Sequence, residues 1–395
     1  MAIQFSNRLK DFAPSEIGEI LEVTQKPEII SFAGGLPAPE LFPIEDVKQA
    51  CKTVLENQGA AALQYSTTEG YIPLRKQICE RMKALDMESP VEDVIITTGS
   101  QQALDLTGKI FLDEGDVVIC ESPTYLAAIN AFKTYQCKFV EIPMDDEGMS
   151  MVELEKSLKE YPHAKFIYTI PDFQNPTGRT LSLERRKKII ALANQYDIPI
   201  VEDNPYGAVR FAGEMLPPIK HFDTEGRVIY LSTFSKIFSP GLRLGWIYAA
   251  PHYIQRYIFL KESTDLHSNI FSQMITAAYM EAVDIEGHID KIKEVYKERR
   301  NLMVDCIERE FPKDIHYTTP EGGLFLWVEL PPQIDTKELF YKALKNNVAF
   351  VPGAPFYPNG GHKNAFRLNY SNMSNEKILE GMKRLGDVLK EVLDA

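Results

Sequence analysis

Short apolar segments alternate with helical patterns from residue 91 to about residue 250, and this alternation constrains the fold more than any other feature. The apolar segments read DVIITTG, DVVICE, KFVEIP, KFIYTIP, IPIVED, VIYLST and LGWIYAA. Strands that are apolar on both faces, with helices between them, are typical of an α/β domain with a largely parallel sheet. Such sheets bind their ligands at the carboxyl ends of the strands, so the chemistry of this chain is expected there.

The pattern changes near residue 285, and the chain is expected to form a large and a smaller domain. A long charged helical stretch at 288–311 leads to short strands in GGLFLWVEL, VAFVPG and AFRLNYS and to a closing amphipathic helix. We predict an N-terminal helix and loop at 1–43 that pack with the smaller domain, a large domain at 44–284 and a smaller α+β domain at 285–395. The Pro- and Gly-rich segment 31–43 is expected to be an extended loop, not a strand of either domain.

Charge and cysteine content exclude several classes of protein. The 395 residues carry a formal net charge of −13, which repels polyanions, so neither nucleic acid nor a membrane is an expected partner. The N-terminus lacks the apolar core of a signal peptide, and no stretch approaches the roughly 20 apolar residues of a membrane span. The five cysteines are scattered and odd in number, which indicates reduced thiols and a cytoplasmic location. The seven histidines form no metal-binding pair.

Two strand ends carry polar residues that suit a ligand but are not diagnostic alone. In IITTGSQQALDL a helix is expected to start at Ser100, where free N–H groups of Ser100 and Gln101 suit a phosphate. Many α/β turns look alike, so a simple helix cap explains this motif equally well. In PDFQNPTGRTLS a rigid turn follows a strand, and Asn175 either faces a ligand or braces the turn.

Two further strand ends are more informative. IPIVEDNPYG places Asp203 at the end of a buried strand, where a carboxylate is costly unless it is paired, and Tyr206 follows. The carboxylate either caps the next turn or holds a cationic ring nitrogen. VIYLSTFSKIFSPGLRLGW brings hydroxyl groups and an arginine, which suit a phosphate, to a lysine whose pKa nearby cations would lower. A phosphate site beside a nucleophilic lysine suggests a phosphorylated aldehyde cofactor.

In their order along the chain, NPTG, VEDNPYG, STFSK with an arginine seven residues later, and FRLNYS resemble the fold type I pyridoxal-phosphate (PLP) aminotransferases. The sequence is most similar to the 2-aminoadipate and kynurenine aminotransferase branch through SFAGGLPAPELFP, LQYSTTEGY, TTGSQQALDL and FSKIFSPGLRLG. The similarity runs from about residue 13 to the end of the chain. It implies a large domain with a mostly parallel central sheet flanked by helices, plus a smaller α+β domain.

The resemblance also implies roles for single residues. Lys236 matches the catalytic lysine that forms a Schiff base with the cofactor and shuttles a proton. The matching cofactor-binding residues are Tyr65, Ser100, Gln101, Tyr125, Asn175, Asp203, Tyr206, Thr233, Ser235, Lys236 and Arg243. The matching substrate-binding residues are Ser15, Gly35, Asn175 and Arg367, with Arg367 expected to bind the α-carboxylate. Tyr65 reaches the neighbouring subunit in this family, which implies a homodimer with shared active sites.

The expected activity is transfer of an amino group from an aromatic, branched-chain or 2-aminoadipate-like L-amino acid to a 2-oxo acid, with 2-oxoglutarate as the acceptor, by a ping-pong mechanism. Alternatives on the same fold are a β-lyase or decarboxylase reaction, or a PLP-binding effector or sensor domain. A nicotinamide dehydrogenase has little support, because no G-x-G-x-x-G follows the early strands.

One departure from the resemblance generates a prediction. Relatives that prefer aminoadipate carry a serine and, three residues later, an arginine that holds an acidic side chain, whereas here Ser15 is followed by Gly18. Gly18→Arg should therefore raise kcat/KM for 2-aminoadipate relative to leucine or phenylalanine. Steady-state kinetics with the three donors measures the ratio, and an unchanged ratio would contradict this explanation of specificity.

Overall fold

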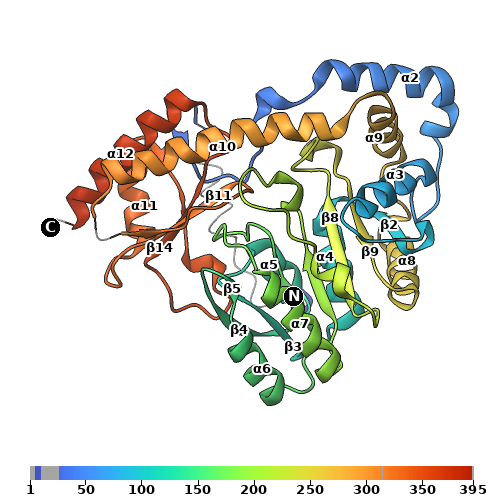
Figure 1. The fold of residues 1–395 in the computed structure, drawn as a ribbon, viewed down its shortest axis with the longest axis horizontal. Coiled ribbons are helices and arrows are strands. Elements are labelled where there is room, and N and C mark those ends of the chain that lie inside the picture. The colour runs from blue at the N-terminus through green and yellow to red at the C-terminus, as the bar shows by residue number, and fades with distance from the viewer. Residues whose placement is uncertain (1–4, 10–25, 314, 394–395) are drawn as a thin grey trace, which may run out of the picture.

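A sheet of eight strands forms the centre of the larger part of the molecule (Figure 1). The computed structural model describes residues 5–9, 26–313 and 315–393, so Ser15 and Gly18 lie outside the described residues. The strand order is β2-β9-β8-β7-β6-β3-β4-β5. The strands are β2 (Val94–Thr97), β3 (Val117–Ser122), β4 (Lys138–Asp145), β5 (Gly148–Met149), β6 (Phe166–Thr169), β7 (Ile200–Asp203), β8 (Val228–Thr233) and β9 (Gly245–Tyr248).

The mostly parallel sheet predicted from the sequence is confirmed. Strands β8, β7, β6, β3 and β4 run parallel to one another, and β5 runs antiparallel to β4. The strand β9 runs antiparallel to both β2 and β8, which the apolar pattern alone did not indicate. Every residue of β2, β6, β7 and β8 is buried, because helices cover both faces of the sheet.

Successive residues of each strand pack on opposite faces of this sheet, as pleating requires. Phe166 and Tyr168 of β6 contact Phe132 of α5 on one face. Ile167 packs with residues of α6 and α7 on the other face. The helices of the larger part are α2 (Ile44–Ala62), α3 (Ile72–Lys83), α4 (Gly99–Phe111), α5 (Leu126–Lys133), α6 (Met151–Glu160), α7 (Leu183–Tyr196), α8 (Pro251–Asp265) and α9 (Ile270–Ala282).

A second sheet, in the order β10-β11-β14-β13, forms the smaller part together with three helices. Helix α10 runs across the top of the molecule in Figure 1 and packs along α12. The elements are α10 (Ile285–Glu310), β10 (His316–Tyr317), β11 (Phe325–Glu329), α11 (Thr336–Lys345), β12 (Val348–Ala349), β13 (Val351–Pro352), β14 (Ala365–Asn369) and α12 (Asn375–Leu393). No helix in the described ranges has the length and apolar run needed to cross a membrane.

The N-terminal segment pairs with the smaller part. Strand β1 (Ile30–Ser31) lies parallel to β12, and the Phe32 amide donates to the Ala349 carbonyl at 2.8 Å. The expectation that residues 31–43 form no strand was therefore wrong at Ser31. The apolar residues on either side of Ser31 are buried, and the segment pairs with β12. The pairing supports the prediction that the N-terminal segment packs with the smaller domain. The domain boundaries at 43/44 and 284/285 stay a prediction.

A buried ion pair fixes the turn after β6 to helix α7. The guanidinium of Arg186 donates to both carboxylate oxygens of Asp172 at 2.6 and 3.2 Å, and both side chains are buried. The Asn204 amide also donates to Asp172, at 2.9 Å. The hydrogen bond between Asn204 and Asp172 joins the loops at the carboxyl ends of β6 and β7, and these loops carry predicted site residues.

Arg186→Met should lower the free energy of unfolding by about 3–5 kcal/mol, because it removes the cation that donates to both oxygens of the buried Asp172 carboxylate. Arg210, the remaining cation, lies 3.9 Å from Oδ1. Lys187→Met is the matched control on the same helix, since its exposed pair with Glu184 is worth at most about 1 kcal/mol. Urea unfolding of both variants followed by circular dichroism makes the comparison. Equal losses in the two variants would contradict the assignment.

Candidate active site

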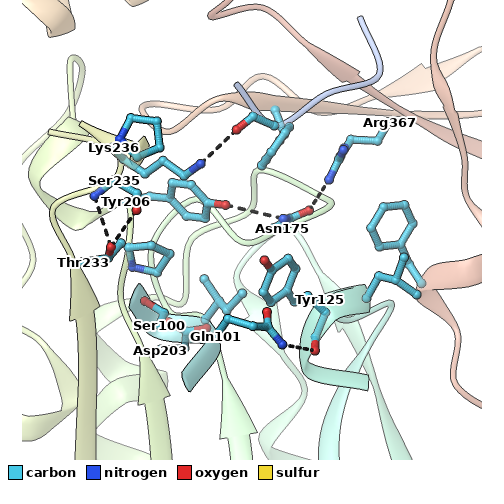
Figure 2. Close-up of a pocket in the computed structure, with 18 of the residues that line it drawn as sticks. Ser100, Gln101, Tyr125, Asn175, Asp203, Tyr206, Thr233, Ser235, Lys236 and Arg367 are labelled. Atoms are coloured by element: carbon cyan, nitrogen blue, oxygen red, sulfur yellow. Dashed lines mark hydrogen bonds between the residues drawn. The ribbon is translucent and has the colours of Figure 1, made fainter. Parts of the chain in front are cut away.

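A cavity of about 370 Å³ lies at the carboxyl ends of β7 and β8 (Figure 2). Ser100 and Gln101 enter it from the first turn of α4, and Asp203 is the last residue of β7. Arg367 reaches it from β14 of the smaller sheet. The cavity therefore lies between the larger and the smaller sheet, at the carboxyl ends of the parallel strands where the sequence analysis expected a ligand to bind.

The structure brings nearly all the predicted site residues together. The residues that line this cavity include Gly35, Ser100, Gln101, Tyr125, Asn175, Asp203, Tyr206, Thr233, Ser235, Lys236, Arg243 and Arg367. Tyr65 does not line it, and its side chain is 79% exposed. Ser15 lies outside the described residues.

The N-terminus of α4 and the segment after β8 form one end of the cavity, which suits an anion. Gly99 has φ +71°, and a Cβ there would lie 2.4 Å from Nη2 of Arg243, so only glycine lets the guanidinium pack against this turn. The buried Ser100 Oγ has no hydrogen-bond partner among the described residues. Thr233 Oγ1 donates to Ser235 Oγ at 2.9 Å. These hydroxyls, the first-turn N–H groups and Arg243 are the donors that a phosphate dianion needs.

Asp203 lines the cavity with one carboxylate oxygen that has no hydrogen-bond partner among the described residues. Tyr168 donates its hydroxyl to Oδ2 at 2.9 Å, whereas the buried Oδ1 has no partner among the described residues. Burial raises the pKa of Asp203 to about 7, and the Tyr168 hydrogen bond opposes that rise. A cationic N–H facing Oδ1 would stabilise the ionised carboxylate. Asn175 Nδ2 lies 3.4 Å from the Tyr206 hydroxyl, and burial raises the pKa of that phenol.

The amine of Lys236, labelled in Figure 2, enters the cavity and donates to the Gly35 carbonyl at 2.9 Å. Burial, followed by the positive charges of Arg367 and Arg243, lowers the pKa of Lys236 to about 8. A substantial fraction of this amine is therefore neutral and nucleophilic near pH 8.

Arg367 enters the cavity from β14 of the smaller sheet. Its Nη1 donates to Asn175 Oδ1 at 2.8 Å and its Nη2 to the Ala33 carbonyl at 2.7 Å. The guanidinium carbon lies 4.1 Å from the ring centroid of Phe325 and 5.2 Å from that of Phe356. Burial lowers the pKa of Arg367 to about 10, so the guanidinium is still charged near neutral pH. Its remaining N–H groups suit a carboxylate.

Sequence reasoning missed several residues of the site. Phe325 and Phe356 line the cavity, and Tyr168 holds Asp203 from the neighbouring strand. The pairing of β6 with β7 places Tyr168 opposite Val201, two residues before Asp203. A tyrosine one residue before the end of the apolar segment 166–169 was therefore a signal that could have been used. A Cβ on Gly35 would lie 3.1 Å from Cζ of Phe325, so this ring leaves little room for any side chain at position 35.

Comparison with known proteins agrees with this geometry. The family model for aminotransferase class I and II matches residues 28–385. The chain belongs to the class I and II aminotransferase family. It is 49% identical over 392 residues to aromatic-amino-acid aminotransferase 1 of Thermococcus litoralis, a match that covers 98% of this chain and 94% of the relative.

Solved structures of other family members share the whole fold. The kynurenine aminotransferase of Pyrococcus horikoshii, solved in complex with PMP, has a TM-score of 0.95 at 44% identity, covering 99% of this chain and 98% of that one. LysN, the α-aminoadipate aminotransferase of Thermus thermophilus, complexed with N-(5'-phosphopyridoxyl)-L-leucine, has a TM-score of 0.92 at 41% identity, with coverage of 99% and 98%. The predicted PLP fold type I is confirmed.

The lowered pKa of Lys236 generates a pH prediction that needs no cofactor. Acylation of Lys236 by acetic anhydride, followed by peptide mass spectrometry, should rise with pH with a midpoint of about 8. Arg367→Gln should move the midpoint to higher pH, because it removes a cation that disfavours the protonated amine. Acetylation of the exposed Lys52, measured in the same digest, is the control for changes in reagent reactivity with pH. A midpoint that Arg367→Gln leaves unchanged would contradict the electrostatic coupling.

Proposed function

We propose that this chain is a PLP-dependent aminotransferase that moves the amino group of an L-amino acid to a 2-oxo acid. One observation carries the proposal: the amine of Lys236 shares a single cavity with two sets of anion-binding groups, Arg243 with the start of α4 and Arg367 on β14. A lysine placed between a phosphate site and a carboxylate site suits a phosphorylated aldehyde on one side and an amino acid on the other. Family membership and the relatives named above support the same activity.

The residues fit the functional groups of PLP. The donors around Arg243, with the unpartnered Ser100 hydroxyl, suit the phosphate. The free Oδ1 of Asp203 suits a protonated ring nitrogen, and the Asn175–Tyr206 pair suits the phenolic oxygen. Two buried polar atoms that lack partners thus face two groups that the cofactor would supply. When bound, PLP accepts electron density from the substrate α-carbon.

The chain's own residues would supply proton transfer and orientation. Lys236, with a pKa lowered to about 8, alternates readily between its neutral and charged forms and can hold the proton removed from the substrate α-carbon. Arg367, fixed by Asn175 and the Ala33 carbonyl, would bind the α-carboxylate and so set which substrate bond faces the lysine.

The lining near Arg367 favours apolar amino acids. Phe325, Phe356, Leu126 and Ile170 line the cavity. The cations among its described lining residues are Lys236, Arg243 and Arg367, and each has a role in binding the cofactor or the α-carboxylate. A second substrate carboxylate finds no further cation in this lining, so we propose aromatic and large aliphatic donors. The name of the Thermococcus litoralis relative supports this donor class. The proposed acceptor, 2-oxoglutarate, rests on the family resemblance alone, because its second carboxylate likewise finds no further cation in the described lining.

We also propose a cytoplasmic homodimer with shared active sites. Tyr65, expected to reach the cofactor phosphate of the neighbouring subunit, is 79% exposed in the single chain, as a residue that acts on a second copy would be. Leu63 beside it is 77% exposed. Exposed apolar residues grouped in this way are typical of interfaces. The acidic charge of the chain supports the expectation that nucleic acid is not a partner.

The cofactor and the activity can be tested together by absorption spectroscopy. Purified protein incubated with PLP should develop a visible band that Lys236→Ala lacks and that Lys52→Ala retains, because Lys52 lies on an exposed face of α2. Adding phenylalanine without an oxo acid should consume the band and release one equivalent of the matching 2-oxo acid. Chromatography of the products measures that release.

The products separate the alternatives. Carbon dioxide release would indicate a decarboxylase, and ammonia with a shortened oxo acid a β-lyase. A band that shifts with amino acid but yields no product would indicate a sensor. Failure of any band to form with PLP would overturn the proposal.

A further inference from the structure

A second cavity, of about 340 Å³, lies next to the site described above, and Pro205 and Thr233 line both cavities. It is enclosed by the end of α3, by the loop after β7 and by the start of α10. Its floor is the face of β8 and β9 that carries Tyr230, Ser232 and Trp246. None of its side chains has a role in the proposed amino transfer apart from Thr233, which touches both cavities.

The two cavities lie on opposite faces of the same strand ends. Because side chains alternate across a strand, Asp203 points into the first cavity while Asn204 lines the second. Pro205 lines both cavities. Likewise Lys236 lies in the first cavity and Ile237 in the second. A molecule in the second cavity would therefore contact the chain neighbours of both Asp203 and Lys236.

Four of the five ionic residues that line the second cavity have ionic partners, and the fifth, Glu80, is exposed. Asp172 at its inner end is bonded to Arg186 and to Asn204. Arg81 and Glu286 pair with each other across the entrance, joining α3 to α10. Lys293 pairs with Asp290 at 3.0 Å. A charged ligand would have to lose its hydration and compete with these ion pairs, whereas an uncharged ligand would not.

The remaining lining is largely apolar. Met82, Leu85, Ala208, Leu216, Ile237 and Trp246 supply it. A cavity of this volume, with an aromatic floor and apolar walls, suits an uncharged ring compound, since burial of its surface provides the binding free energy. The Ser232 hydroxyl donates to the Asn204 carbonyl at 2.8 Å, so it needs no ligand, whereas the buried Nε1 of Trp246 has no hydrogen-bond partner among the described residues.

We propose that the second cavity is an effector site for a small, uncharged, mostly apolar molecule and that its occupancy alters the lysine site through Asn204, Pro205 and Ile237. The binding step is independent of the proposed function. The effect on catalysis rests on it, so the two are tested separately.

Binding is tested with 4-iodobenzyl alcohol, an uncharged ring whose iodine quenches tryptophan fluorescence and is located by anomalous scattering. The chain has two tryptophans, so Trp327→Phe leaves Trp246 as the only reporter. Saturable quenching and an iodine peak in the second cavity are expected. Ala208→Leu, which fills the cavity, should weaken the affinity by about tenfold or more, equivalent to 1.4 kcal/mol.

Two controls keep the binding test decisive. Ala191→Leu makes the same change on the exposed side of α7 and should leave the quenching unchanged. Ala84→Phe narrows the cavity from the end of α3 and replaces Ala208→Leu should that variant not fold. Quenching that does not saturate, an iodine peak in the first cavity alone, or equal affinity in the filled variants would overturn the proposal.

The effect on the lysine site is tested in the PLP-loaded enzyme. Saturation with 4-iodobenzyl alcohol should change kcat or KM for phenylalanine by about fivefold or more, the lower end of typical couplings between sites. The filled variants should lose this response and keep their activity. An equal response in the filled variants would mean that the probe competes in the first cavity, and no response despite binding would overturn the effector role.

Discussion

The site depends on three cations held in one cavity by neutral partners. Lys236 donates to the Gly35 carbonyl, Arg367 to the Ala33 carbonyl and to the Asn175 amide oxygen, and Arg243 to the Pro240 carbonyl. Carbonyl dipoles orient these groups without neutralising them. The positive potential of the cavity is therefore left for anionic ligands. Burial, followed by repulsion from Arg367 and Arg243, keeps the pKa of the lysine low. Binding a phosphate and a carboxylate would relieve that repulsion.

The sheet brings these groups together because its central strands are parallel. Parallel neighbours end at the same edge, so the residues that follow β6, β7 and β8 meet there although they lie far apart in sequence. Asp203 could not stay buried on such an edge alone. Tyr168, on the next strand, donates to one oxygen and leaves the other for a ligand. The strand register thus decides both where the carboxylate lies and which of its oxygens is free.

The sequence predicted the sheet, the smaller α+β part and 12 of the 19 residues that line the cavity. Polar residues at strand ends are local signals, whereas Gly35, Tyr125 and Arg367 were predicted through the resemblance alone. The aromatic contacts of Arg367 could not be predicted from the sequence. Phe356 lies in a short turn with no periodic pattern, and its approach to Arg367 is set by packing between β11, β14 and that turn. The direction of β9 was also hidden, since a buried strand is apolar whichever way it runs. The exposure of Tyr65 could be interpreted only through the resemblance, because a single chain does not show its second copy.

The N-terminal segment couples the smaller sheet to the lysine. Strand β1 is fixed to β12, the next turn gives its Ala33 carbonyl to Arg367, and Gly35 two residues later gives its carbonyl to Lys236. The Asn369 amide also donates to the Phe32 carbonyl at 2.9 Å, so β14 holds the same segment. Any shift of the smaller sheet on binding a carboxylate at Arg367 must therefore move the carbonyl that holds the lysine amine. Carboxylate binding and release of the lysine are in this way linked through six residues of backbone, 30–35, without a contact between the two side chains.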